Sequence, residues 1–143
     1  MRINLLRYAG VYIAAAVALA ALLWALEAFL GVSAPSGLST ALPPMLAALI
    51  EGQAYARTTR APLPGGEAWA GALRMTLVVA AINAVVLLGV LLVMPELREP
   101  QLLGIVAVVF VVLLGVVFLA NRFFFGMGAK SQLKALGAEG AHK

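Results

Sequence analysis

The stretch Met75–Met94, MTLVVAAINAVVLLGVLLVM, contains 20 residues and no charged side chain. A helix needs roughly 20 apolar residues to cross the hydrocarbon core of a bilayer. Hydrophobic residues make up 64% of the 143-residue chain, and charged residues only 11%. A soluble domain has about a quarter of its residues charged. We therefore expect an all-α, polytopic membrane protein with the bilayer as its solvent.

Three more apolar segments flank this stretch. The second segment of the chain carries Pro43-Pro44 near its start and is short for a full crossing. We expect it to be a kinked spanning helix, with a re-entrant segment as the alternative. We predict a single domain of four transmembrane helices at about 8–32, 38–57, 67–94 and 101–125, followed by a cytoplasmic tail at 126–143.

The first apolar segment also needs to be compared with a secretory signal peptide, because Arg2 and Arg7 precede it. The apolar core of a signal peptide has about 7–15 residues, which is shorter than this segment. Pro35 would also follow the cleavage site that Val32-Ser33-Ala34 resembles. We expect a retained first helix.

The ten basic residues predict the orientation. Four crossings place the N-terminus, the middle loop and the C-terminus on one side of the membrane, and nine of the ten Lys and Arg residues fall there. Such residues concentrate in cytoplasmic loops, so both termini should be cytoplasmic. The nine are Arg2, Arg7, Arg57, Arg60, Arg74, Arg122, Lys130, Lys134 and Lys143; the opposite side has Arg98.

Polar residues inside the apolar segments are the candidate site. Ionisable groups in a membrane face protein or water and mark functional sites by default. Glu51, in IEGQAYAR, is therefore either a proton or cation site or a structural partner of Arg74, Arg122 or Tyr55. Asn83 should hydrogen-bond across helices, and Gln53 and Asn121 are weaker candidates for the same role. Glu27 either reaches the interface or pairs with Arg98.

The second segment also carries a row of small residues. Ala48, Gly52 and Ala56 recur at four-residue spacing, which lets the backbone of another helix come close. We expect a packed interface there rather than a pore. Gly126 and Gly128 follow an apolar run, and we interpret them as a turn or helix end.

Several classes of function lack support. The chain has no Cys, which removes disulfides and thiolate ligands, and its only His is His142. No catalytic residue, metal site or cofactor site is predicted. The basic residues are scattered along the chain, so no nucleic-acid partner is expected.

Four short motifs carry a resemblance. They are Gly52–Arg57 (GQAYAR), Arg60–Pro62 (RAP), Gly66–Trp69 (GEAW) and the GxGAK pattern at Gly126–Lys130. Together with the length and the four hydrophobic segments, they resemble a family of small four-helix bacterial inner-membrane proteins of unknown function. The resemblance implies a location in the bacterial inner membrane and four helices, and it implies no activity.

Three functions are compared. The first is a non-enzymatic inner-membrane protein that acts through helix packing, either self-associating as a homo-oligomer or as an accessory subunit of a membrane complex. The alternative is a small proton-coupled transporter or channel that uses Glu51. An intramembrane enzyme is third. We favour the first because small-residue seams are present and the loops are too short to form a soluble domain.

Overall fold

The computed structural model describes residues 3–31 and 36–140. This part of the chain is all-helical and contains no strand, which confirms the predicted class. A short 3-10 turn, η1 (Pro95–Arg98), joins the last two helices. The four α-helices are α1 (Leu5–Leu30), α2 (Ser36–Thr59), α3 (Gly65–Val93) and α4 (Pro100–Gly140).

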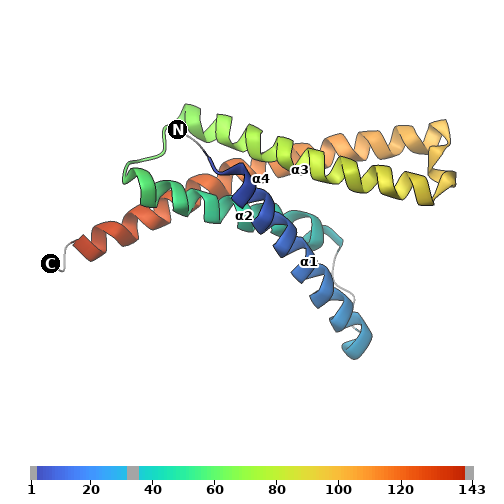
Figure 1. Ribbon diagram of the computed structural model, residues 1–143, viewed down its shortest axis with the longest axis horizontal. Coiled ribbons are helices and arrows are strands. Elements are labelled where there is room, and N and C mark those ends of the chain that lie inside the picture. The colour runs from blue at the N-terminus through green and yellow to red at the C-terminus, as the bar shows by residue number, and fades with distance from the viewer. Residues whose placement is uncertain (1–2, 32–35, 141–143) are drawn as a thin grey trace.

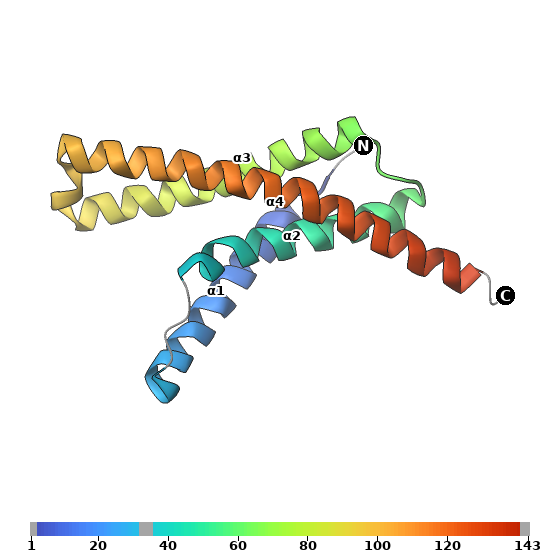
Figure 2. The ribbon, with the colours of Figure 1, turned by 180° about the vertical axis from the view of Figure 1, so that it is seen from behind.

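The helices meet at one crossing and then separate (Figures 1 and 2). α3 and the first half of α4 form an antiparallel pair, and α2 lies along the second half of α4. α1 crosses α2 and projects away from that pair. We call Ile13–Leu30 the α1 arm, and we call the pair formed by Leu77–Val93 and Pro100–Val116 the hairpin arm.

The contact between α2 and α4 depends on two glycines. A Cβ atom on Gly52 would overlap the carbonyl oxygen of Phe125 in α4. A Cβ atom on Gly128 would in turn overlap the carbonyl oxygen of Leu49 in α2. The two backbones therefore touch directly, and each glycine is needed for the approach.

The other two residues of the predicted small-residue row lie in the same contact. Ala48 and Ala56 are fully buried, as is Ala129 on α4. Of the predicted row, Gly52 makes the close approach to α4, and Ala48 and Ala56 are buried one turn before and after it. Small side chains of this kind let van der Waals packing hold two membrane helices together.

The interpretation of Gly126 and Gly128 as a turn or helix end is wrong. Both lie inside α4, which continues for 41 residues to Gly140 instead of ending near residue 125. The physical reason is tertiary packing, which supplies most helix stability and overrides the low helix propensity of glycine. Residues that sequence pattern assigned to a tail are therefore part of the packed core.

The molecule exposes far more surface than a compact monomer. Its accessible area is 9265 Å², whereas a compact soluble protein of 14.9 kDa would expose about 7,000 Å². The excess lies on the two arms, where Val17, Phe29 and Val93 are 63%, 79% and 81% exposed. α1, α3 and residues 100–137 of α4 are each long and apolar enough to cross a membrane.

We expect Gly52→Ala and Gly128→Ala each to lower the free energy of unfolding by about 1–3 kcal/mol, the usual effect of overpacking. Denaturant titration in mild detergent, followed by circular dichroism, measures this. Gly104→Ala is the matched control, because a Cβ atom there meets no atom within 4 Å. Equal stability of Gly52→Ala and Gly104→Ala would contradict the close approach of α2 and α4.

Candidate functional site

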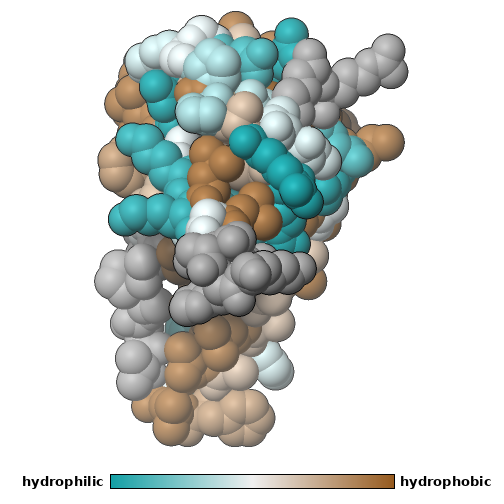
Figure 3. Space-filling model, turned by 90° about the vertical axis from the view of Figure 1, so that its left-hand side faces the viewer, coloured by the Kyte–Doolittle hydropathy of each residue, from teal (hydrophilic) through white to brown (hydrophobic). Residues whose placement is uncertain are grey.

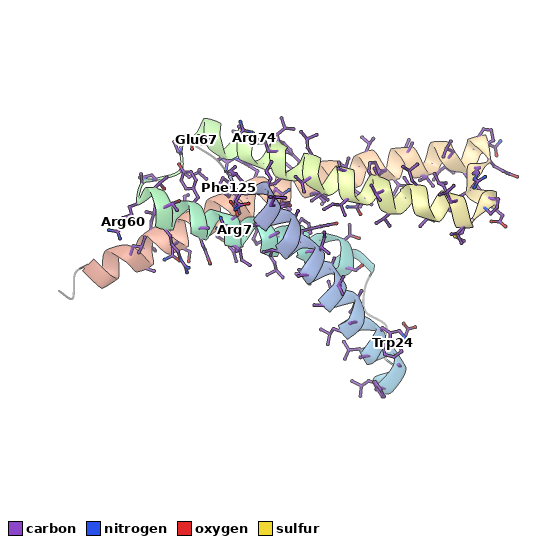
Figure 4. All side chains as sticks on the ribbon, in the orientation of Figure 1. Arg7, Trp24, Arg60, Glu67, Arg74 and Phe125 are labelled. Carbon is purple, nitrogen blue, oxygen red and sulfur yellow. The ribbon has the colours of Figure 1, made fainter. Side chains whose placement is uncertain are left out.

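A cluster of polar side chains lies where the four helices meet, at the start of both arms. We call it the polar layer. The molecule is hydrophilic at this end, and Arg7, Arg60, Glu67 and Arg74 are found around it (Figures 3 and 4). The polar layer consists of Asn4, Arg7, Tyr8, Glu51, Thr76 and Asn121.

Glu51 is the acidic centre of the polar layer and is 3% exposed. Its Oε1 accepts a hydrogen bond from the backbone N–H of Asn4 at 2.8 Å. Its Oε2 accepts from Nε of Arg7 at 2.8 Å, and Nη2 of Arg7 is also 2.8 Å from Oε2. Glu51 is therefore buried beside two hydrogen-bond donors, Asn4 and Arg7.

The partners expected for Glu51 were wrong. Arg74, Arg122 and Tyr55 were named, but the carboxylate pairs with Arg7. The reason is the position of the two helices relative to each other. α1 begins beside the second half of α2, so Arg7 lies next to Glu51.

This pairing also fixes the first turn of α1. The side chain of Asn4 caps the helix, its Oδ1 accepting from the backbone N–H of Arg7 at 3.0 Å. The Glu51 carboxylate therefore sits at a helix N-terminus, where the helix dipole favours a negative charge. Glu51 binds the start of α1 to α2 through one backbone donor and one guanidinium.

A second chain of hydrogen bonds connects α1, α4 and α3. The hydroxyl of Tyr8 donates to Oδ1 of Asn121 at 2.8 Å, and Nδ2 of Asn121 donates to Oγ1 of Thr76 at 3.1 Å. Tyr8 and Asn121 are fully buried, and Thr76 is 8% exposed. Buried polar groups are costly unless paired, and these three satisfy one another.

Asn83 lies on α3, farther from the crossing than Thr76. Its Nδ2 donates to the hydroxyl of Tyr12 on α1 at 2.9 Å and to the carbonyl oxygen of Val79 at 2.9 Å. The prediction that Asn83 hydrogen-bonds across helices is confirmed. Beyond this contact α1 leaves α3.

Tyr55 belongs to a separate contact at the end of α2. Its hydroxyl donates to Oε2 of Glu67 in α3 at 2.9 Å, and its ring meets the ring of Phe125 edge-on at 5.9 Å. These contacts join the ends of α2 and α3 across the short loop that connects them.

The remaining candidate residues lie apart from Glu51. Gln53 is half-buried, with its backbone against Gly128. Arg74 is exposed and borders a cavity of about 120 Å³ together with Tyr55. The guanidinium carbon of Arg122 lies 5.0 Å from the ring centre of Trp69. Of the six candidates, Glu51 and Tyr55 border one cavity, and the six together do not form one site.

Glu27 and Arg98 also lie apart. Nε and Nη2 of Arg98 donate to the carbonyl oxygens of Leu91 and Leu92, at 2.7 and 3.2 Å, and so satisfy the end of α3. Glu27 is exposed near the far end of the α1 arm. The arrangement favours the interpretation of Glu27 as a residue that reaches the interface.

The chemistry available at the polar layer is limited. Glu51, Arg7, Asn4 and Thr58 border a cavity of about 220 Å³. Within residues 3–31 and 36–140, no three His, Cys, Asp or Glu side chains come together as metal ligands would. The polar layer can bind helices to one another, and it offers one carboxylate beside one guanidinium.

Sequence reasoning missed Asn4, Arg7, Tyr8 and Thr76. The usable signal was the position of each residue along its helix. Arg7 and Tyr8 stand at the start of the first apolar run and Thr76 near the start of the third, so they lie at one level on neighbouring helices. Comparing how far each residue lies from the end of its apolar run would have identified Arg7 as a possible partner of Glu51.

No protein-family profile, curated protein or solved structure matches this chain. The geometry of the polar layer and of the arms therefore carries the functional argument.

We expect Glu51→Leu to lower the free energy of unfolding by about 2–3 kcal/mol, because Asn4 and Arg7 lose a charged partner. Glu51→Gln should lower it by about 1 kcal/mol, since the amide oxygen still accepts one hydrogen bond. Denaturant titration measures both, and exposed Glu27→Gln is the control. A double-mutant cycle with Arg7→Gln that gives no coupling energy would contradict the ion pair.

Proposed function

We propose that this chain is a non-enzymatic protein of the bacterial inner membrane that acts through helix packing, by self-association or as an accessory subunit of a membrane complex. The observation that carries the proposal is the contrast between the polar layer and the arms. The buried polar groups of the layer bind one another within one chain. The apolar arms extend beyond them without protein cover.

The surface of the arms supports a packing role. Soluble monomers rarely expose large contiguous apolar patches, and such patches mark interaction sites or lipid contact. The α1 arm and the hairpin arm diverge from the crossing (Figure 1), and each arm exposes large apolar side chains such as Val17 and Val85. Helices of another chain can pack on these surfaces with the van der Waals contacts that drive association in lipid.

We place the polar layer at the cytoplasmic end of the membrane segments, with both termini in the cytoplasm. The positive-inside rule supports this orientation, since nine of the ten Lys and Arg residues fall on that side. The 21 residues of α4 that precede Asn121, from Pro100 to Ala120, make about 31 Å of helix. This is about the thickness of a hydrocarbon core. We propose α2 as the fourth membrane segment, with its first turns lying beside Leu113–Ala120 of α4, within the proposed span.

The arrangement of Glu51 supports packing over proton transport. A proton carrier needs a carboxylate that water reaches alternately from both sides. Glu51 is instead held by Asn4 and Arg7 at the basic end of the molecule. The carboxylate paired in this way joins α1 to α2.

Photo-crosslinking in native membranes tests the proposal. A photoreactive amino acid placed at Val17, Val85 or Val108, each well exposed on an arm, should give discrete adducts. An adduct of twice the chain mass indicates self-association, and one defined heavier adduct indicates a partner. The control position is Arg57, which is exposed at the polar end. Adducts at Arg57 and none on the arms would contradict the proposal.

Single cysteines test the orientation cleanly, because the chain has no native cysteine. We expect Leu30→Cys and Arg98→Cys to react with a membrane-impermeant maleimide from the periplasm, and Ser131→Cys to react only after lysis. Labelling of Arg98→Cys without Leu30→Cys would mean that α1 and α2 form a re-entrant pair.

Reconstituted vesicles test the alternative function. We expect Glu51→Gln to leave pH-driven movement of a cationic solute unchanged from that of the unmodified chain. Uptake that is present in the unmodified chain and lost in Glu51→Gln, with the variant still folded and inserted, would establish the transporter.

A further inference from the structure

The second half of α4 borders a groove that the polar layer does not use. The groove has a volume of about 760 Å³ and runs between α4 and the segment from Pro62 to Ala68. We call it the basic groove. Three of its lining side chains are cationic, namely Arg122, Lys130 and Lys134. The others include the apolar Phe123 and Met127 and the hydroxyl of Ser131.

We propose that the basic groove binds the phosphate headgroup of an anionic phospholipid, with an acyl chain lying along Phe123 and Met127. This proposal goes beyond the proposed function and shares with it only the location in a membrane. It holds whether or not the arms associate with another chain.

The charge of the basic groove is uncompensated. Its described lining residues include three cations and no carboxylate. Glu67 precedes the lining residue Ala68, but its Oε2 accepts from the Tyr55 hydroxyl. Arg122, Lys130 and Lys134 recur at multiples of four residues and so share one face of α4. They cover about 18 Å along the helix.

Arg122 has hydrogen-bonding capacity that the protein does not fill. Its Nε is buried and has no hydrogen-bond partner in the described part of the chain. Buried donors nearly always have a partner, and guanidinium groups bind phosphate oxygens strongly and in a defined geometry. Trp69 stacks on this side chain, and a Cβ atom built on Gly126 would lie 3.4 Å from Nη1 of Arg122.

The position along α4 favours a lipid over a soluble phosphate. Arg122 follows within two residues of the apolar run that ends at Ala120, which is the level where headgroups begin. Phe123 and Met127 are 66% and 40% exposed beside the cations. A soluble anion makes no favourable contact with this apolar surface. A phospholipid, in contrast, can place its glycerol and first methylenes there. Basic pockets on the cytoplasmic side of membrane helices recognise anionic headgroups in the same way.

Quenching of tryptophan fluorescence by brominated lipid tests the proposal directly. Trp69 lies against Arg122, and Trp24→Phe leaves it as the single tryptophan. The full chain is reconstituted in phosphatidylcholine vesicles that contain either brominated phosphatidylglycerol or brominated phosphatidylcholine. At equal mole fraction, the anionic lipid should quench Trp69 more strongly. The preference should persist with excess inorganic phosphate.

Two charge-matched variants locate the site. The groove variant should lose most of the preference for the anionic lipid, by about tenfold or more, since each cation near the surface contributes about fivefold. The control variant removes the same charge from exposed positions outside the groove and should keep the preference. Flotation confirms equal insertion of both. The groove variant is Arg122→Gln/Lys130→Gln/Lys134→Gln, and the control is Arg57→Gln/Arg60→Gln/Arg74→Gln.

Four outcomes would overturn the proposal. Equal quenching by the two brominated lipids would show that the groove does not select a headgroup. If both variants lost the preference for the anionic lipid equally, the preference would depend on net charge and not on the basic groove. Loss of the preference in inorganic phosphate would assign the groove to a soluble anion. A photoreactive residue at Met127 that yields protein adducts in place of lipid adducts would assign it to a partner protein.

Discussion

The direct contact between the backbones of α2 and α4 at Gly52 and Gly128 is the constraint on which the rest of the structure depends. Successive residues of a helix point about 100° apart. Once Gly52 faces α4, its neighbour Glu51 points about 100° to the side of that contact, where α1 lies. The carboxylate then meets Asn4 and Arg7. Close packing on one side of α2 thus fixes the electrostatic contact on the other.

The same constraint separates a packed crossing from two open arms. Near the crossing, polar groups hold α1, α3 and α4 through Tyr8, Asn121 and Thr76. Past Tyr12 and Asn83 the described side chains of the arms are almost entirely apolar. Lipid is as apolar as leucine, so no hydrophobic force closes the arms on each other. The chain therefore leaves a large apolar surface for lipid or for another protein, and the buried groups of the polar layer are already paired with one another.

The sequence was most informative where length and composition decide the outcome. The apolar runs predicted the helices, and four-residue spacing predicted the packing row at Ala48, Gly52 and Ala56. It failed where a contact depends on which helices are neighbours. Gly126 and Gly128 read as a helix end because their low propensity was visible and their partner α2 was not. Glu51 was paired with Arg74 and Arg122 because the relative depth of α1 and α2 depends on packing, which the local sequence pattern does not contain.

The central claim is that a crossing held by α2 and α4 leaves the α1 arm and the hairpin arm apart. Double electron–electron resonance between spin labels at Leu22→Cys on α1 and Val108→Cys on α4 tests it most directly in a bilayer, since both positions are exposed. We predict one population of long distances, as expected for the diverging arms of Figure 1. A single population of short distances would mean that α1 folds onto the hairpin arm and covers the chain's own apolar surface, and it would contradict the account.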